Sequence, residues 1–388
     1  MEHHSVISQK FEVQYEYKLY FTESIFSADN PLLESILASN SAEKTKKVLF
    51  VIDDKVALKH PRLSENIRDY CFKYDGIGLK NILIVPGGEN CKNDPDVVET
   101  ILKAVNDYSI CRHSFVIAIG GGSVIDTVGY AATIAHRGVK LIRIPTTVLA
   151  QNDAAVGVKN SVNAFGKKNF IGTFSLPVAI INDFKFLETL EQRDWISGIA
   201  EAVKVALLKD PTFFDFIRKN ASKLAKRDKD AMQHLIYRCA EIHMQHIAQG
   251  GDPFEKGSSR PLDFGHWAAH KLEQMTNYKL RHGEAVAMGI ALDVTYAQRM
   301  GLIKKELLDE VLLTFEQIGF NLQLPIKNET AINTLVLGIE EFREHLGGQL
   351  TITLISGVGI KHDVHEINHQ KMREAITLRS RKQTALSC

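Results

Sequence analysis

The sequence lacks several features that define broad classes of protein. Its five cysteines are odd in number and scattered, with no CxxC pair, and they are Cys71, Cys91, Cys111, Cys239 and Cys388. This pattern argues against a disulfide scaffold and favours a reduced, cytoplasmic setting. Lys and Arg total 47 against 46 Asp and Glu. No basic field therefore indicates a nucleic-acid or anionic-membrane partner.

Long apolar runs are also missing. No stretch reaches the roughly 20 residues that a membrane-spanning helix needs, and the first residues do not resemble a secretory signal. Internal repeats and low-complexity segments are absent as well. What the chain does have is 45% hydrophobic residues over 388 positions. This content is enough for a packed core and for two domains.

The first half alternates short apolar runs with amphipathic segments. Buried strands are predicted at 47–52, 81–85, 114–119 and 139–144, with a further strand at 176–181. Such alternation is typical of a mainly parallel sheet covered by helices. We therefore predict an N-terminal, Rossmann-like α/β domain in residues 1–185.

The second half has a helical pattern. Helices are predicted at 195–208, 211–226, 229–248, 263–276, 283–300 and 303–318. Residues 252–260 have the composition of a loop, and residues 374–388 that of a weakly ordered polar tail. Residues 186–388 should therefore form a mostly α-helical domain.

A glycine-rich turn, Gly120-Gly121-Gly122-Ser123, lies between a predicted strand and an apolar helix. Glycines there let a pyrophosphate approach the backbone, and the helix N-terminus supplies N–H donors. A tight strand-to-helix turn without a ligand explains the glycines about equally well.

Three further strand ends favour the nucleotide interpretation. Asp53 ends the first strand, where a carboxylate could bind a ribose diol, and Gly87-Gly88-Glu89 and Thr146-Thr147 end two others. Doubly wound sheets bind ligands at the carboxyl ends of their strands. Here the acid precedes the glycine turn, which reverses the order of the usual dinucleotide fingerprint.

A polar, glycine-containing stretch follows the fourth strand. It includes Asp153, Lys159, Lys168 and Asn169. One interpretation is a solvated hairpin, since charged runs are usually solvent-exposed. The other is an anion site in which Lys and Asn donate to a phosphate, with Arg137 adding a bidentate contact.

Metal-ligand candidates gather in the second half, namely Glu201, His266, His270 and His282. His266 and His270 are four residues apart, so they share one face of a helix and could share one ion or substrate. One carboxylate with two imidazoles leaves a coordination position open, as in catalytic metal sites. Glu201 and Lys204 also share a helix face. Burying such groups without partners would be costly.

The remaining histidines are interpreted as surface or satisfied residues. They include His113, His234, His243, His246, His362 and His365. An enzyme that needs both a divalent metal and a dinucleotide belongs to a narrow class.

The motifs together resemble those of the sugar phosphate cyclase superfamily, whose best-known member is 3-dehydroquinate synthase. The resemblance spans about residues 45–365, and its motifs lie at 86–92, 120–126, 136–139, 145–147, 167–174, 198–204, 263–270 and 282–286. It implies a bound NAD⁺, a divalent metal that is usually zinc with cobalt as an alternative, and a phosphorylated sugar substrate.

The resemblance also implies roles for individual residues. The implied metal ligands are Glu201, His266 and His282. The implied NAD contacts are Asp53, Glu89, Lys92, Gly121, Gly122, Ser123, Asp126, Thr146, Thr147, Lys168, Thr189 and Leu190. The implied substrate or catalytic residues are Asp153, Lys159, Asn169, Lys204, Asp263 and His270, with Lys361 at the phosphate. Arg137 matches an arginine that reaches the partner's active site, which implies a homodimer.

The chain departs from the dehydroquinate synthase pattern where that enzyme holds its substrate's carboxylate. The expected lysine is missing from residues 241–247, the expected asparagine is Asp263, and the arginine is one position late, as Arg260. The Asp263 anion would repel a carboxylate but would accept hydrogen bonds from hydroxyls. We therefore expect sedoheptulose 7-phosphate, which carries a hydroxymethyl group at that position.

His270 bears on the product. Cyclases that form 2-epi-5-epi-valiolone tend to have proline at this position, so the chain looks most like the 2-epi-valiolone synthase branch. Four alternatives stay open: a 2-epi-5-epi-valiolone synthase, a 3-dehydroquinate synthase with a rearranged carboxylate site, a net polyol dehydrogenase, and a non-catalytic NAD-binding relative.

Overall fold

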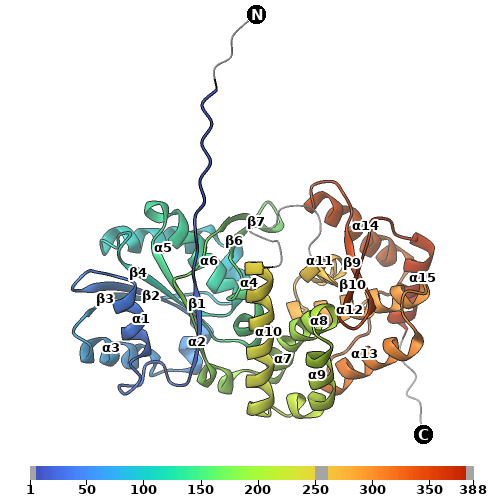
Figure 1. Ribbon diagram of the computed structural model, residues 1–388, viewed down its shortest axis with the longest axis horizontal. Helices are drawn as coiled ribbons and strands as arrows, with labels where there is room; N and C mark the ends of the chain where they lie inside the picture. The colour runs from blue at the N-terminus through green and yellow to red at the C-terminus, as the bar shows by residue number, and fades with distance from the viewer. Residues whose placement is uncertain (1–5, 250–260, 382–388) are drawn as a thin grey trace, which may run out of the picture.

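The computed structural model describes residues 6–249 and 261–381. Two parts lie side by side in it (Figure 1). The N-terminal part is a parallel sheet covered by helices, and the C-terminal part is mostly helical. The predicted fold class is therefore confirmed. The division after residue 185 stays a prediction.

Six strands form the main sheet, and hydrogen-bonded neighbours run parallel. In spatial order they are β1 (Lys18–Thr22), β8 (Ala179–Asp183), β5 (Lys140–Pro145), β4 (Phe115–Gly120), β2 (Lys46–Asp53) and β3 (Ile77–Val85). The strands predicted at 47–52, 81–85, 114–119 and 139–144 correspond to β2, β3, β4 and β5, and the one at 176–181 corresponds to β8. The sequence does not predict β1, because a partly buried edge strand has no continuous apolar run.

Helices cover both faces of the sheet. They include α1 (Leu32–Ser39), α3 (Leu63–Lys73), α5 (Pro95–Asp107) and α6 (Gly122–Ile134). Successive side chains of a strand point to opposite faces. Ile117 of β4 therefore packs in the cluster with α1 and α3, whereas its neighbour Val116 packs with α5 and α6.

The order of strands reverses at β2. The next strand in sequence, β3, lies on one side of β2, and β4 lies on its other side. Parallel sheets of this kind bind ligands outside the carboxyl ends of the strands at such a switch point. Helices α2 (Asp54–Lys59) and α6 begin on the two sides of it.

A two-stranded hairpin extends from the sheet domain. Its strands are β6 (Lys159–Ala164) and β7 (Lys167–Phe174), and they are antiparallel. The segment that leads into it is held by the buried Arg143 of β5, which donates to Ala155 O and Asn160 Oδ1, both at 2.8 Å. These hydrogen bonds anchor the base of the hairpin to the sheet.

The helical part contains nine α-helices and a small hairpin among its described residues. They are α7 (Gln192–Ser197), α8 (Ile199–Lys209), α9 (Pro211–Ala225), α10 (Lys229–Gln249), α11 (His266–Met275), α12 (His282–Arg299), α13 (Lys305–Ile318), α14 (Glu329–His345), α15 (His369–Ser380), β9 (Ile352–Gly357) and β10 (Ile360–Val364). Within the described ranges, no helix combines the length and apolar character needed to cross a membrane.

Three predicted boundaries differ from the structure. The helix predicted at 195–208 is divided at Gly198 into α7 and α8. The helix predicted at 263–276 begins only at His266, because Gly265 adopts a left-handed conformation with φ 79°. The predicted tail is helical up to Ser380, because α15 buries three apolar side chains. The predicted loop at 252–260 lies outside the described residues.

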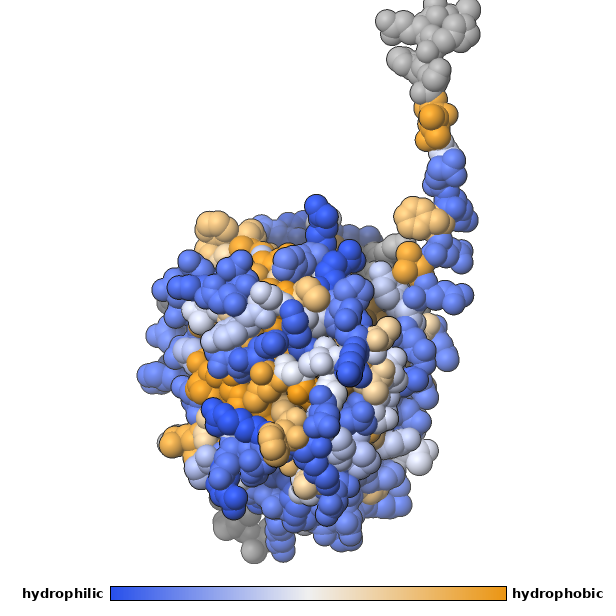
Figure 2. Space-filling model, turned by 90° about the vertical axis from the view of Figure 1, so that its left-hand side faces the viewer, coloured by the Kyte–Doolittle hydropathy of each residue, from blue (hydrophilic) through white to orange (hydrophobic). Residues whose placement is uncertain are grey.

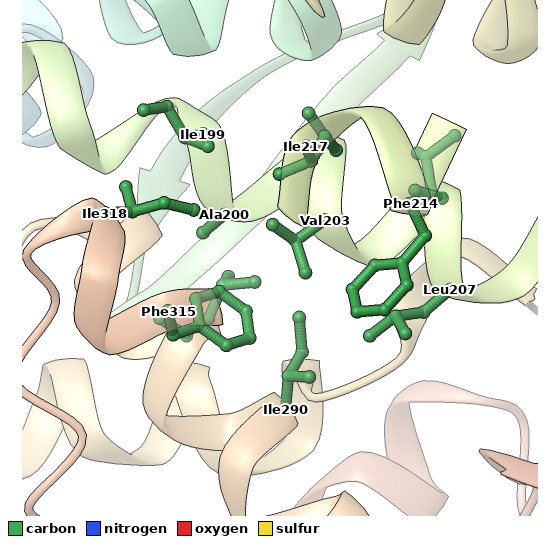
Figure 3. Close-up of a cluster of buried hydrophobic side chains, with 14 of the residues drawn as sticks. Ile199, Ala200, Val203, Leu207, Phe214, Ile217, Ile290, Phe315 and Ile318 are labelled. Atoms are coloured by element: carbon green, nitrogen blue, oxygen red, sulfur yellow. The ribbon is translucent and has the colours of Figure 1, made fainter. Parts of the chain in front are cut away.

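One apolar cluster joins the helices that matter most for the site (Figure 3). Val203 of α8, Ile217 of α9, Ile290 of α12 and Phe315 of α13 are fully buried together in it. A close-packed core of this kind resists small shifts. It therefore fixes the position of α8 relative to α12.

The end of the molecule that carries β3 has an apolar area among charged side chains (Figure 2). Ile84 of β3 is 50% exposed, and Phe72 of α3 is 88% exposed. An edge strand also offers unpaired backbone groups to another chain. This face is therefore suited to an interface.

Candidate active site

The carboxyl ends of three strands meet at the switch point of the sheet. Asp53 ends β2 and caps α2, accepting from Lys55 N at 2.9 Å. A Cβ atom on Gly87, after β3, would lie 2.3 Å from Asp53 Oδ1, and one on Gly120 would lie 3.1 Å from Asp53 Cβ. Only glycine permits this close approach. Burial raises the pKa of Asp53, which is 6% exposed.

The glycine turn places a helix N-terminus at the same edge. Gly121 caps the 13-residue helix α6, and Gly122 and Ser123 form its first turn. The first N–H groups of a helix have no intrahelical partner and attract anions. Thr146 N donates to Gly120 O at 3.0 Å, which brings the end of β5 beside this turn. Thr147 lies beside Gly121.

Thr189 and Leu190 reach the same edge from the other side. Thr189 closes a 3-10 turn (Phe184–Thr189) that Leu190 caps. The Thr189 hydroxyl lies 2.9 Å from His60 Nε2, at the end of the helix that Asp53 begins. Thr189 is therefore joined to the helix that begins after Asp53.

Lys92, Asp126 and Asn169 form one polar cluster around the buried ammonium of Lys92. Lys92 Nζ donates to Asp126 Oδ2 at 2.6 Å, to Ser161 Oγ at 3.0 Å and to Asn169 Oδ1. Lys92 is only 6% exposed. The cluster ties the helix α4 (Glu89–Asn93) and α6 to the β6–β7 hairpin.

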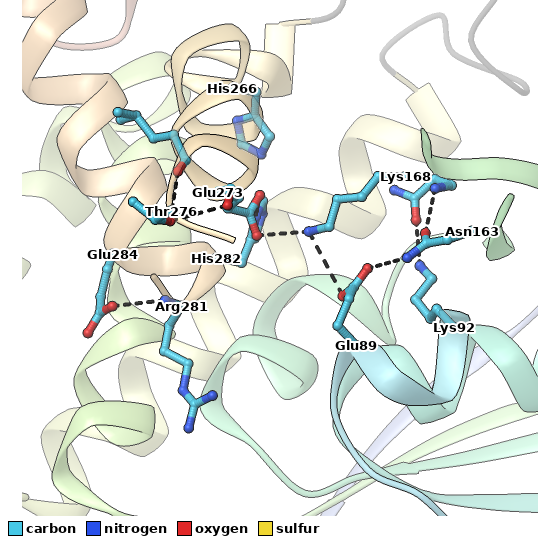
Figure 4. A network of polar contacts seen from close by, with 12 residues as sticks. Glu89, Lys92, Asn163, Lys168, His266, Glu273, Thr276, Arg281, His282 and Glu284 are labelled. Atoms are coloured by element: carbon cyan, nitrogen blue, oxygen red, sulfur yellow. Dashed lines mark hydrogen bonds and ion pairs between the residues drawn. The ribbon is translucent and has the colours of Figure 1, made fainter. Parts of the chain in front are cut away.

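Lys168 reaches from the hairpin to the helical part (Figure 4). Its Nζ donates to Glu273 Oε1 at 2.8 Å and lies 3.9 Å from Glu89 Oε2. Burial alone would lower the pKa of Lys168, but the carboxylates of Glu273 and Glu89 raise it above its ordinary value. The solvated-hairpin interpretation is therefore wrong for Lys168, which is 17% exposed, whereas Asn169 is exposed.

Three candidate metal ligands converge from three helices. Glu201 lies on α8, and His266 and His282 begin α11 and α12. The two Nε2 atoms lie 3.5 Å and 3.4 Å from Glu201 Oε1, and all three ligand atoms lie within 4.8 Å of one another. Glu201 is fully buried. Neither of its oxygens accepts a hydrogen bond from a described residue, although the Lys204 ammonium forms an ion pair with it.

This donor set fits a divalent cation. A carboxylate and two imidazoles that face one another without good hydrogen bonds offer three lone pairs to one point. Burial alone would raise the pKa of Glu201, but Lys204 and His266 lower it well below its ordinary value. The carboxylate is therefore charged, as a metal ligand must be.

Close packing of helix starts brings these ligands together. A Cβ atom on Gly283, next to His282, would lie 1.8 Å from Ser197 O, and one on Gly265, next to His266, would lie 2.7 Å from Ile290 N. Asp293 of α12 accepts from Gly265 N at 3.0 Å. A larger side chain at either glycine would push a ligand-bearing helix away.

Glu273 is a site residue that the sequence interpretation missed. Its Oε2 lies 3.2 Å from His282 Nδ1, and it is 3% exposed. A carboxylate there fixes the imidazole tautomer so that Nε2 faces Glu201. Spacing gave a signal, because Glu273 follows His266 by seven residues and His270 by three and so shares their helix face.

Lys204 and Asp153 lie beside the metal cluster. Burial alone would lower the pKa of Lys204, but Glu201 and Asp153 raise it. Asp153 Oδ1 lies 3.2 Å from His243 Nδ1 of α10. His243 therefore contacts a residue of the site, a position that the sequence interpretation did not give it. The available signal was its place in the stretch where the resemblance expects a lysine.

His270 and Asp263 complete this side of the site. The His270 ring lies 5.6 Å from that of His266 and 6.0 Å from that of His282. Burial and the two neighbouring imidazoles lower the pKa of His270 to about 3. Asp263 lies in the short turn before α11, close enough to Lys204 to raise its pKa.

The structure also describes three further predicted residues. Arg137 is exposed after α6 and adopts a left-handed φ of 61°. Lys159 begins β6 and is exposed, and Lys361 of β10 pairs with Asp363 at 2.6 Å. Arg260 lies outside the described residues.

Comparison with known proteins identifies the family. Residues 82–197 match the family described as 3-dehydroquinate synthase N-terminal, and residues 198–337 match 3-dehydroquinate synthase C-terminal. The chain belongs to the 3-dehydroquinate synthase family. This confirms the resemblance to sugar phosphate cyclases.

Relatives within the family have different activities. A 3-dehydroquinate synthase of Buchnera aphidicola is 36% identical over 295 residues, which are 75% of this chain and 81% of the relative. A 2-epi-valiolone synthase of Actinosynnema mirum is 34% identical over 298 residues, 75% of this chain and 76% of the relative. Sequence identity alone therefore does not separate the two activities.

A solved structure extends the comparison to the fold. A 2-epi-5-epi-valiolone synthase from Streptomyces hygroscopicus subsp. jinggangensis, with NAD⁺ and Zn²⁺ bound, superposes with a TM-score of 0.85. It is 25% identical, and the match covers 96% of this chain and 99% of that one. The two-part architecture is thus common to this chain and that 2-epi-5-epi-valiolone synthase.

Proposed function

We propose that this protein is a sedoheptulose 7-phosphate cyclase of the 2-epi-valiolone synthase type. The observation that carries the cyclase part is the convergence of Glu201, His266 and His282 beside Lys204, with Lys168 linking this cluster to the strand ends. A metal centre next to a dinucleotide edge suits a reaction that oxidises a ring hydroxyl and later reduces the ketone again.

The metal would be held by Glu201, His266 and His282. NAD⁺ would lie at the strand ends, with Asp53 at a ribose and Gly121, Gly122 and Ser123 at the pyrophosphate. The related structure contains NAD⁺ and Zn²⁺, which supports both assignments. When bound, the two groups together supply the reversible oxidation of a ring hydroxyl.

The chain's own residues have separate tasks in this scheme. The Lys204 ammonium stabilises negative charge that develops on the substrate oxygen beside the metal. His270 and the Asp153–His243 pair are within the site to accept or return protons. Lys159 and Asn169 bind the substrate on the phosphate side. Loss of phosphate by β-elimination, ring opening and an intramolecular aldol step then give a carbocycle with no net redox change.

The choice between the two substrates depends on the end of the substrate that carries no phosphate. Asp263 adds a negative charge near Lys204, and α10 carries His243 where a carboxylate-binding lysine is expected. The Asp263 carboxylate, in a poorly hydrated site, repels a substrate carboxylate. A hydroxymethyl group can instead donate to Asp263, and the proposal keeps Arg260 and His270 as substrate-binding residues.

We further propose a homodimer in which Arg137 binds the substrate phosphate in the partner's site, with Lys361 at the same phosphate. The exposure of Arg137 supports this role. The apolar face around β3 is a candidate interface (Figure 2). The chain would fold as a nucleotide domain in residues 1–185 and a metal domain in residues 186–388.

The deciding experiment measures phosphate release with NAD⁺ and zinc or cobalt. The two substrates are sedoheptulose 7-phosphate and the keto acid 3-deoxy-arabino-heptulosonate 7-phosphate. We expect release from the sedoheptulose substrate alone and no accumulation of NADH. The product's epimer, 2-epi-valiolone or 2-epi-5-epi-valiolone, is then read by NMR. The variant Asp263→Asn should lower kcat/KM for sedoheptulose 7-phosphate.

A 3-dehydroquinate synthase is the second candidate, and the 36% identity to the Buchnera aphidicola enzyme favours it. Release from the keto acid alone would establish it and reject the Asp263 argument. NADH accumulation without phosphate release would instead indicate a dehydrogenase.

A further inference from the structure

We infer that Glu273 is a positioning residue that fixes His282 for the metal and, through Lys168, joins the nucleotide part to the metal part. The inference rests on the proposed function in one respect, since it takes Glu201, His266 and His282 as the metal ligands. It assigns no contact with substrate to Glu273. The two carboxylate oxygens of Glu273 have different partners, one in each part of the protein, and the proposed role follows from these two contacts.

One oxygen of Glu273 faces the metal cluster. Oε2 lies 3.2 Å from His282 Nδ1, and the opposite ring nitrogen, Nε2, lies 3.4 Å from Glu201 Oε1. Nδ1–H therefore donates to Glu273, and Nε2 keeps its lone pair for the ion. Without this acceptor, His282 could rotate or adopt the other tautomer.

The other oxygen faces the hairpin of the nucleotide part. Oε1 accepts from Lys168 Nζ at 2.8 Å, and the same ammonium lies 3.9 Å from Glu89 Oε2 (Figure 4). Asn163 Nδ2 donates to Glu89 Oε1 at 2.6 Å. A continuous chain of polar contacts thus runs from α4, after the third strand, to a metal ligand.

Glu273 and Lys168 are both largely buried, so losing either contact should be costly. Glu273 is 3% exposed, and the side chain of Lys168 is 17% exposed. A buried carboxylate needs both partners to offset its lost hydration. The hairpin and α11 are therefore held together at the position where His282 is oriented.

Helix α11 also offers an internal control on another of its faces. Lys271 forms an ion pair there with Glu341 of α14, whose side chain is 52% exposed. That pair also joins α11 to another element, but it contacts none of the three ligands. Glu341→Gln thus removes the carboxylate partner of Lys271 on α11 without touching His282.

The experiment measures zinc affinity of the full chain by competition with a chelator, without substrate. We expect Glu273→Gln to weaken zinc binding about 10–100-fold and to change the visible spectrum of the Co²⁺-loaded protein. Glu273→Asp keeps a carboxylate and should recover part of the affinity. Glu341→Gln should leave the zinc affinity unchanged.

A second variant tests the connection between the two parts. Lys168→Gln keeps the hydrogen bond from His282 to Glu273, so it should weaken zinc binding less than Glu273→Gln. It should weaken NAD⁺ binding, measured by titration in the same protein. The effects of the two substitutions on zinc affinity should not add, since both act through Glu273.

The outcomes separate this inference from the proposed function. If Glu273→Gln folds, as judged by circular dichroism, and binds zinc as tightly as the parent, the inference is wrong while the metal site stands. An equal loss of zinc affinity in Glu341→Gln would also overturn it, because a structural role would then suffice. If the parent chain binds no zinc, the proposed metal site itself is wrong.

Discussion

The strand-end region and the metal cluster differ in how their residues are brought together. At the strand ends, Asp53 and Gly120 are neighbours because β2 and β4 are already paired along their length, from Val48 opposite Phe115 to Ile52 opposite Ile119. At the metal cluster, Glu201, His266 and His282 come from three helices with no shared ladder. Their meeting depends on packing at helix starts.

Because of this difference, single substitutions should have different effects in the two regions. A sheet edge is supported by many backbone hydrogen bonds, so single side-chain changes should affect binding there more than geometry. The metal cluster depends on a few buried charges and glycine contacts. Single changes there should affect both chemistry and stability.

The largest effect is expected from Lys204→Met. Removing this ammonium leaves Glu201 and Asp153 buried without their common cation. Phosphate release should fall about 10²- to 10⁴-fold, and the metal-free protein should lose about 3–5 kcal/mol of unfolding free energy. Enzyme assays and urea unfolding would measure the two effects. Lys223→Met, at an exposed lysine, is the control. Retained activity in Lys204→Met would show that Lys204 has no role in the reaction.

The next effect concerns pH and Asp293, which supports the turn before His266. Burial raises the pKa of Asp293 to about 7. The folded state then holds a proton that the unfolded state has released, so stability should fall as pH rises from about 4 to about 7, by roughly 4 kcal/mol at most. Urea unfolding across this range measures it. Asp293→Asn should flatten that part of the profile, and an unchanged slope would contradict the assignment.

A smaller effect is expected at the strand-end region from Asp126→Asn. It deprives the buried Lys92 of its carboxylate while leaving Ser161 and Asn169 as acceptors. We expect a loss of about 3 kcal/mol in unfolding free energy with zinc affinity unchanged. Combined urea and chelator measurements would show it. A large loss of zinc affinity would mean that the two regions are not separable in this way.

The smallest effect is expected from an exposed pair in the helical part. Arg218 lies 2.9 Å from Glu310, and both side chains are 40% exposed. Glu310→Gln should change the unfolding free energy by no more than about 0.5–1 kcal/mol, because solvent screens such pairs. A loss comparable with that of Lys204→Met would show that burial does not explain the contrast.

The alternation of strands and helices, and the residues at each strand end, could be predicted from the sequence alone. The sequence also determined that His266, His270 and Glu273 share a helix face. These features follow from the local periods of strand and helix, which a chain carries in its own pattern. The same local logic misplaced the start of α11, because the left-handed Gly265 is set by contact with α12.

The contacts between charged side chains of the site could be found only from the tertiary structure. Lys168 reaches Glu273, which lies 105 positions later in the chain. His243 faces Asp153, which lies 90 positions earlier. Glu201 meets His266 and His282, which follow it by 65 and 81 positions. No local period encodes such contacts. They arise when apolar faces pack in one register and bring buried charges to partners that offset the loss of water.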